Sequence, residues 1–284
     1  MQWIWDRQSV WSQAAGHAKR AITRARTVAL VLGVTGACAG TTAAQVMAWS
    51  DMAGKSLAFL SAVAVGLVPL ATKRAGPQQV RDWTRLRSVS EQLKSELYAY
   101  LAHVAPYRDA DAPQMLLDRT ERALTDASDL VGHTVALTPR RRALPAVTDV
   151  GSYLELRVVG QIEGYYLPRA AYMSQLNSQV RRLEVVLAAT AAVLGAVSGA
   201  FGADWATAWV ATITTVAAAV TAHAAASRYA YQEMEFSRTA AELESLTAHR
   251  TEDADPATDD AFVDQCERVI SAQNEEWRAK WLSE

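Results

Sequence analysis

The stretch Val185–Ser227, VVLAATAAVLGAVSGAFGADWATAWVATITTVAAAVTAHAAAS, is apolar except for one turn at Gly202-Ala203-Asp204. A helix needs about 20 predominantly apolar residues to cross the hydrocarbon core of a bilayer. The segments 185–203 and 205–226 both come close to that length, and the turn between them is too short to be anything but a tip. The stretch therefore predicts a transmembrane hairpin.

Small residues follow both helices of this hairpin. Gly195 and Gly199 have the small-xxx-small spacing that lets helix backbones approach closely in lipid, so we expect helix packing there. On the second helix small and hydroxyl side chains recur at three- and four-residue steps: Thr207, Ala211, Thr214, Ala218, Thr221 and Ala225. This face either packs or lines water, and its candidate pore-lining residues are Thr207, Thr214, Thr221 and His223. Because His223 lies close to Arg228, the alternative for it is an interfacial, snorkelling histidine.

A second hairpin precedes the first in the chain. Residues 27–49 form an apolar run with Gly36 and Gly40 in GxxxG spacing, which predicts helix packing at these two glycines. A loop over 51–55 and a shorter apolar run over 57–72 follow. A short span can be accommodated by bilayer thinning or by oligomerisation. We therefore expect four spans, at about 27–49, 57–72, 185–203 and 205–226.

The positions of Lys and Arg predict the orientation. The tips carry only Asp51, Lys55 and Asp204, whereas basic residues flank the open ends of both hairpins: Lys19 to Arg26, Lys73 with Arg74, Arg181 with Arg182, and Arg228. Because short loops rich in Lys and Arg stay in the cytoplasm, both termini and the central segment should be cytosolic. The expected location is the cell (inner) membrane, with several passes.

Polar helical segments surround the two hairpins. The whole chain of 284 residues has a net charge of −2 and is half hydrophobic, an average that hides the contrast between apolar runs and segments dense in Arg, Asp and Glu. Residues 1–26 predict a helix that continues into the first span. After the second span a coiled-coil seam is readable: Trp83, Leu86, Ser90, Leu93, Leu97, Tyr100 and Val104. The predicted fold is an all-α membrane protein, with four transmembrane helices as two hairpins and cytosolic helical-bundle or coiled-coil extensions.

The region between the hairpins has two features. Residues 138–151 form a basic, proline-punctuated linker in which Arg140–Arg142 predict a solvated charge run, with contact to anionic lipid as the alternative. Beyond it a four-residue spacing places polar and aromatic side chains on one helical face: Tyr153, Arg157, Gln161 and Tyr165. Such a face can hold a cytosolic interface together without catalysis.

No catalytic, cofactor or metal site is expected. The chain has no GxGxxG, phosphate-binding glycine loop, GxSxG or HExxH, and its five histidines lie far apart without an acid or cysteine at ligand spacing. Two acidic turns, Asp109 with Asp111 and Asp253 with Asp255, lack the glycine and the later glutamate of a calcium loop, so helix capping is the expected role. The protein is not predicted to be an enzyme or to bind nucleic acid.

The two halves of the chain repeat one another. Arg7, Gly33 and Gly40 correspond to Arg169, Gly195 and Gly202, and Asp118-x-x-Glu121-Arg122 corresponds to Asp264-x-x-Glu267-Arg268. These matches predict a tandem duplication. The first repeat would cover 1–137, the linker 138–151 and the second repeat 152–284.

A family resemblance is carried by Tyr153-Leu-Glu-Leu-Arg157-x-x-x-Gln161-x-x-x-Tyr165-Tyr166-x-x-Arg169-Ala170, by the hairpin that follows and by Glu275-Glu276-Trp277. The chain resembles the SLATT family, two-helix membrane domains that accompany cyclic-oligonucleotide synthases and SLOG-type nucleotide sensors in bacterial defence loci. The resemblance implies an oligomeric membrane effector, with a nucleotide-sensing or nucleotide-synthesising partner, that opens or disrupts the bilayer. The alternative is a non-conducting membrane anchor whose cytosolic helices bind a partner.

Overall fold

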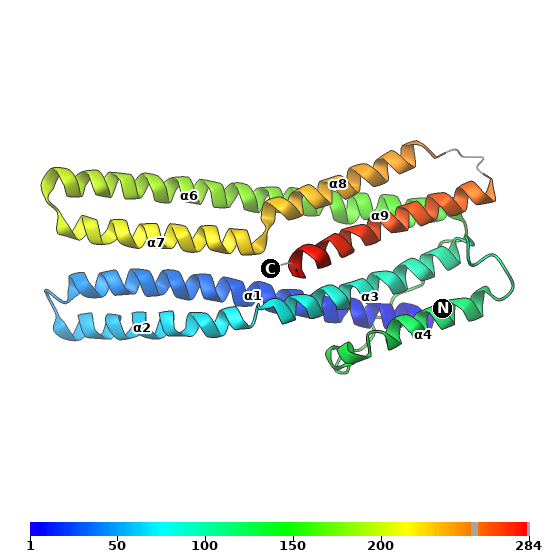
Figure 1. The fold of residues 1–284 in the computed structure, drawn as a ribbon, viewed down its shortest axis with the longest axis horizontal. Helices are drawn as coiled ribbons and strands as arrows, with labels where there is room; N and C mark the ends of the chain where they lie inside the picture. Colours follow the sequence, from blue (N-terminus) through cyan, green and yellow to red (C-terminus); the bar gives the residue numbers. More distant parts are fainter. Residues whose placement is uncertain (251–254, 283–284) are drawn as a thin grey trace. The chain divides into compact units, whose positions relative to one another are not determined.

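The computed structural model describes residues 1–250 and 255–282, with side chains through residue 272. The described secondary structure is helical, and the chain divides into two compact units (Figure 1). We call Ala21–Gly76 with Tyr172–Gln232 the hairpin unit, and Met1–Arg20, Pro77–Ala171 and Glu233–Glu284 the polar bundle. Each unit draws on both halves of the chain, so the compact units cut across the predicted repeats. The repeat boundaries themselves stay a prediction.

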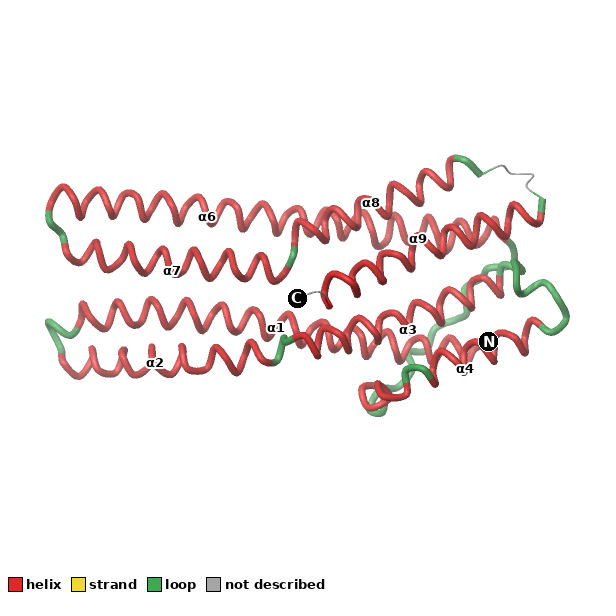
Figure 2. The backbone as a smooth tube through the Cα atoms, viewed as in Figure 1, coloured by secondary structure: helices red, strands yellow, loops and turns green. Residues whose placement is uncertain are grey.

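The hairpin unit contains two helical hairpins, as predicted. Four helices of the chain are long and apolar enough to cross a membrane, and their apolar parts lie in this unit. Short loops join the members of each pair (Figure 2). The pairs are α1 with α2 and α6 with α7: α1 Gln2–Val46, α2 Asp51–Lys73, α6 Leu167–Phe201 and α7 Asp204–Ser227.

The helix that contains the second span begins earlier than the sequence pattern predicted. We expected a loop over 51–55 and a short span over 57–72, but α2 begins at Asp51 and has 23 residues. Ser50 caps its first turn by accepting from the Ala53 amide at 3.4 Å, and Lys55 pairs with Asp51 at 2.6 Å. At 1.5 Å per residue this helix is about 35 Å long. Its added ends carry Asp51, Lys55 and Lys73, so the apolar run is still the predicted one over 57–72. Bilayer thinning or oligomerisation stays the expected way to accommodate it.

Close approach of α1 and α2 depends on glycine. A Cβ on Gly36 would lie 2.6 Å from Val65 Cγ2, and one on Gly40 would lie 3.0 Å from the Ser61 hydroxyl. The Ser61 hydroxyl also donates to the Gly36 carbonyl at 2.7 Å. At the tip, a Cβ on Gly54 would come within 2.9 Å of the Met47 backbone. The predicted GxxxG face thus packs inside its own hairpin.

The two hairpins meet through α1 and α7. The Thr41 and Thr212 hydroxyls hydrogen-bond across these helices, and Arg26 Nη1 donates to the Ala226 carbonyl at 2.7 Å. Gly195 and Gly199 on α6 take no part in this contact, because a Cβ on either would meet no described atom within 4 Å. The helix packing predicted at Gly195 and Gly199 is therefore not made within one chain.

The polar bundle contains the remaining helices. Figure 1 shows α3, α4, α8 and α9 in this part of the chain. Among them α3 packs against both α4 and α9. The elements are α3 Pro77–Leu101, α4 Ala112–Thr125, the 3-10 turn η1 Ser128–His133, α5 Val150–Tyr153, the π-helical segments η2 Leu154–Val159 and η3 Ile162–Tyr166, α8 Tyr229–Ala248 and α9 Pro256–Leu282.

The predicted coiled-coil seam is the buried face of α3. Trp83, Leu86, Ser90, Leu93 and Leu97 are all at most 5% exposed, which confirms the seam over these positions. The helix ends at Leu101, so the last predicted member, Val104, is buried beyond its end. These apolar side chains form the centre of the polar bundle.

The basic linker packs onto the amino-terminal helix. Trp5 is buried and its indole donates to the Ala143 carbonyl at 2.9 Å, while the Arg142 guanidinium lies 3.5 Å from the centre of the indole ring. Arg142 also donates to the side chain of Gln8. Arg140–Arg142 are all exposed, as expected for a solvated run. Arg142 in addition places its cation over the tryptophan face and donates to the Trp5 carbonyl.

Candidate functional site

A buried arginine lies at the centre of the polar bundle. Arg157 is 1% exposed and makes a bidentate pair with Glu267 of α9, in which Nε and Nη2 each donate over 2.8 Å. The Tyr153 hydroxyl donates to the same carboxylate at 3.0 Å. A buried charge is tolerated only when its partners and hydrogen bonds are well placed, and these contacts meet that condition.

Further groups complete this ionic cluster, which we define as Arg157, Glu267, Glu91, Lys94 and Gln161. Arg157 Nη1 lies 3.9 Å from Glu91, and its guanidinium lies 5.1 Å from the centre of the Tyr98 ring. The Gln161 side-chain oxygen accepts from Arg157 and from Lys94, at 3.2 Å each. The cluster therefore joins α3, α9 and the π-helical segments in one polar network.

Burial and charge act in opposite directions on the paired groups. Burial by itself lowers the pKa of Arg157, but Glu267 and Glu91 raise it above the ordinary value of an arginine. Burial by itself raises the pKa of Glu267, but Arg157 and the Tyr153 hydroxyl lower it below the ordinary value of a glutamate. Both groups are consequently charged at neutral pH, as an ion pair.

Lys94 is the least favourable member of the cluster. Burial, followed by the nearby charge of Arg157, lowers its pKa to about 8, against the opposing effect of Glu91 and Glu267. Between about pH 8 and 10.5, the ordinary pKa of a lysine, the unfolded chain retains a proton that the folded chain has released. The free energy of unfolding therefore rises with pH through this window.

We expect Lys94→Met to stabilise the polar bundle at pH 7, by roughly 1–3 kcal/mol, because it removes a buried charge that costs free energy below pH 8. The advantage of methionine should shrink as the pH approaches 10.5. Thermal unfolding of both proteins in the same detergent, at pH 7 and at pH 10.5, measures this difference. An equal effect of the substitution at both pH values would contradict the assignment.

The four predicted interface residues all lie inside the polar bundle. Tyr153 and Arg157 contact Glu267, Gln161 bridges Arg157 and Lys94, and the Tyr165 ring stacks edge-on against Phe236 of α8 at 5.8 Å. They hold segments of this chain together. Sequence reasoning missed their partners, although Glu267 stood in the repeated Asp-x-x-Glu-Arg pattern, which could have indicated a shared structural role.

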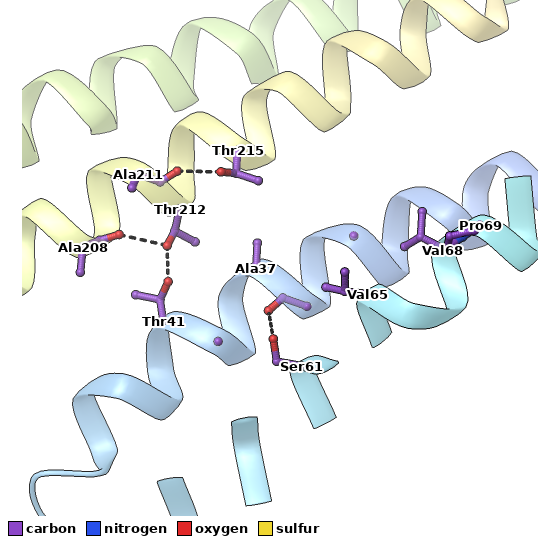
Figure 3. Close-up of a pocket in the computed structure, with 13 residues that line it drawn as sticks. Ala37, Thr41, Ser61, Val65, Val68, Pro69, Ala208, Ala211, Thr212 and Thr215 are labelled. Atoms are coloured by element: carbon purple, nitrogen blue, oxygen red, sulfur yellow. Dashed lines mark hydrogen bonds between the residues drawn. The ribbon is translucent and has the colours of Figure 1, made fainter. Parts of the chain in front are cut away.

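A groove in the hairpin unit is the second candidate site (Figure 3). Its volume is about 740 Å³. Small and apolar residues of α1, α2 and α7 line it: Gly33, Gly36, Ala37, Gly40, Thr41, Ser61, Val65, Val68, Pro69, Ala208, Ala211, Thr212 and Thr215. The Thr215 hydroxyl donates to the Ala211 carbonyl at 2.9 Å, and the Thr212 hydroxyl to the Ala208 carbonyl at 3.1 Å. A groove with such a lining suits acyl chains or water better than a charged ligand.

The predicted pore-lining residues lie elsewhere on α7. Thr207 hydrogen-bonds the Ser198 hydroxyl, and Thr221 donates to Glu184 at 2.7 Å, so both face α6 of their own hairpin. Thr214 is exposed and donates to the Val210 carbonyl. The ring of His223 lies near the Tyr229 hydroxyl, 3.4 Å away. The groove is lined by Thr212 and Thr215 instead.

Of the two acidic turns, only the second shows a side-chain helix cap among the described residues. Asp255 accepts from the Thr258 amide at 2.7 Å, at the start of α9. Asp111 precedes α4 without a side-chain cap bond. Asp253 and the side chains of Glu275-Glu276-Trp277 lie outside the described residues. Among the residues described, no group of three or more His, Cys, Asp and Glu side chains could hold a metal ion.

These features define an all-α membrane protein, in which two hairpins accompany a helical bundle with a buried ionic cluster. Residues 153–277 match a family model described as "SMODS and SLOG-associating 2TM effector domain 1", SLATT_1. Residues 9–114 match a second model, described as "Protein of unknown function (DUF4231)". No curated protein and no solved structure matches the chain. The SLATT_1 match covers the second hairpin and, from the ionic cluster, Arg157, Gln161 and Glu267. Glu91 and Lys94 of the cluster lie within the second match.

Proposed function

We propose that the protein is a membrane effector of a bacterial defence system, acting with a nucleotide-sensing or nucleotide-synthesising partner and without catalysis of its own. The observation that carries this proposal is the SLATT_1 match over 153–277, because that description names a two-span effector associated with SMODS and SLOG proteins. The helices support it, since α6 and α7 form the expected hairpin within the matched residues. The DUF4231 match over the first half is compatible with a divergent second copy of the same unit.

The mechanism we propose is an oligomeric pore or local membrane disruption. The groove between α1, α2 and α7 supports it, because an apolar space with a few hydroxyls can admit water or lipid chains when copies assemble. The open face of Gly195 and Gly199 is available to pack against a second copy. The alternative is a non-conducting anchor, in which the small residues of the groove only pack and the polar bundle binds a partner.

Leakage of dye from liposomes tests the conduit. Thr212→Val with Thr215→Val removes two hydroxyls from the groove, and dewetting of the more apolar space should reduce leakage several-fold. Thr214→Val is the matched control for Thr215→Val, because both threonines donate only to their own helix and Thr214 lies outside the groove. Thr212→Val also removes the bond to Thr41, so it is measured separately as well. The wild type and both variants must be compared at equal membrane abundance, with the activating partner present.

The controls separate three models. If the conduit instead runs along the other face of α7, replacing Thr207, Thr214 and Thr221 by valine should reduce leakage, and the groove variant should not. If neither set changes leakage, neither face is the conduit. Absence of leakage from the wild type with its partner would favour the anchor.

The proposed orientation places both termini and the polar bundle in the cytosol. Cysteines at Ser50 and Asp204, at the two tips, should react with an impermeant thiol reagent in intact cells because basic residues flank the opposite ends. Cysteines at the exposed positions Gln114 and Ser245 should react only after the cells are permeabilised. The opposite pattern would reverse the orientation.

A further inference from the structure

The helix that leads into the second hairpin contains two π-helical segments. It is continuous from Val150 to Phe201, and the π-helical segments η2 and η3 lie near its beginning. A π-turn holds one more residue than an α-turn, is rare, and occurs frequently at functional sites. Both segments lie beside the ionic cluster, because η2 contains Arg157 and Gln161 directly precedes η3.

The π-turns decide which side chains face the interior. Tyr153 and Tyr166 are both at most 2% exposed, and they are 13 positions apart in the sequence. At about 100° per residue an unbroken α-helix would turn them about 220° apart, on opposite sides. Two π-turns take up one residue each and reduce the angle to about 20°. The π-helical register therefore places both buried tyrosines on the same side of the helix.

Contacts with α9 fix this register at η2. Arg157, inside η2, is held by two 2.8 Å hydrogen bonds to Glu267, and Tyr153, directly before η2, donates to the same carboxylate. α9 is itself tied down by Asp260, which accepts from Arg108 at 2.6 Å and from the Ala105 amide at 2.7 Å. Withdrawal of α9 would remove the only carboxylate that bonds both Tyr153 and Arg157 among the described contacts.

We propose that the Arg157–Glu267 pair is a latch that keeps η2 and η3 π-helical, and that opening it converts these turns to α-helix. Each conversion advances the residues beyond Tyr166 by one position, about 100° and 1.5 Å. Because the helix continues to Phe201, the change reaches the second hairpin along the backbone. This latch rests on the proposed function: it is the means by which α9 would control the rotation of the helix that enters the second hairpin.

Two neighbouring alanines can report the register. Ala170 is buried and Ala171 is exposed in the latched state. After conversion of both turns, residue 170 takes the place of residue 172, which is exposed, and residue 171 takes the place of the buried residue 173. After conversion of one turn, both positions are exposed. Ala170 thus gains exposure in either case.

The experiment uses the full chain in lipid nanodiscs, with Cys38 and Cys266 replaced by alanine and a single cysteine at position 170 or 171. In the latched protein an impermeant maleimide should label position 171 at least ten times faster than position 170. Arg157→Met with Glu267→Met opens the latch without leaving an unpaired charge, and Arg157→Lys serves as a second variant that keeps the charge but loses the fork. Labelling of position 170 should then rise at least tenfold.

A deletion control separates a register change from general loosening. Deleting Glu155 and Gly164 removes one exposed residue from each π-turn. Both turns then have the residue number of α-turns, so opening the latch can no longer shift the register of the following helix. In that background the methionine pair should leave position 170 protected. The proposal is overturned if position 170 stays protected in the folded methionine variant, or if it becomes labelled in the deletion background as well. The labelling needs no leakage, so a protein that never conducts can still show the latch.

Discussion

Arg157→Ala is expected to lower the free energy of unfolding of the polar bundle by about 3–5 kcal/mol, the usual loss when one partner of a buried ion pair is removed. The guanidinium is 1% exposed, and its removal leaves the Glu267 carboxylate buried without its bidentate donor. Glu91 loses a nearby cation as well. Unfolding in urea, followed by circular dichroism in a fixed detergent, measures the change.

The methionine pair is the matched control for this prediction. Arg157→Met with Glu267→Met removes both charges at similar volume, and such replacements are often neutral or stabilising. We therefore expect the double variant to unfold closer to the wild type than Arg157→Ala does. A loss below about 1 kcal/mol in Arg157→Ala would mean that water or Lys94 replaces the guanidinium, and that the pair does not hold the bundle together.

Gly36→Leu should be the most damaging single substitution in the hairpin unit. Even its Cβ would lie 2.6 Å from Val65 Cγ2, with the Ser61 carbonyl and the Val65 amide at 3.5 Å. Overpacking of this kind typically costs about 1–3 kcal/mol, and we expect the upper end because the β-branched Val65 side chain has little freedom to move away. The midpoint of thermal unfolding in detergent should fall accordingly.

Gly33→Leu provides the comparison on the same helix. A Cβ on Gly33 meets no described atom within 4 Å, so the same substitution one turn away should change the midpoint little. Gly199→Leu should likewise leave the single chain intact, and it should alter the particle size only if copies pack through this face as proposed. Equal losses from Gly36→Leu and Gly33→Leu would show that helix propensity, and not contact with Val65, controls the stability of the hairpin.

The sequence predicted the elements whose signals are local. Apolar length predicted the hairpins, and heptad spacing predicted the buried face of α3 from Trp83 to Leu97. The extent of α2 was missed because the polar residues Asp51 and Lys55 resemble a loop, whereas in the fold they form an ion pair within the first helical turns. This i,i+4 pair can be recognised only once residues 51–55 are known to be helical.

The candidate site was predicted only in part, because its residues lie far apart in the sequence and because the π-turns change which side chains of one helix face inward. Tyr153, Arg157, Gln161 and Tyr165 were placed on one face, but the angle between Tyr153 and Tyr166 depends on two π-turns that leave no clear mark in a sequence. Glu267 lies 110 residues after Arg157, so no spacing rule connects them. On α7 small residues occur on several faces, and the pattern could not show that Thr212 and Thr215 line the groove.

The interleaved assembly of the polar bundle has a consequence for synthesis in the cell. Its segments come from the beginning, the middle and the end of the chain, and both hairpins are translated before α9 leaves the ribosome. Arg157 therefore has no Glu267 to neutralise it while the 110 residues that separate them are translated. Chains truncated before α9 would carry an uncompensated cation in the core and would be exposed to quality-control proteases, so complete synthesis is a condition for a stable protein.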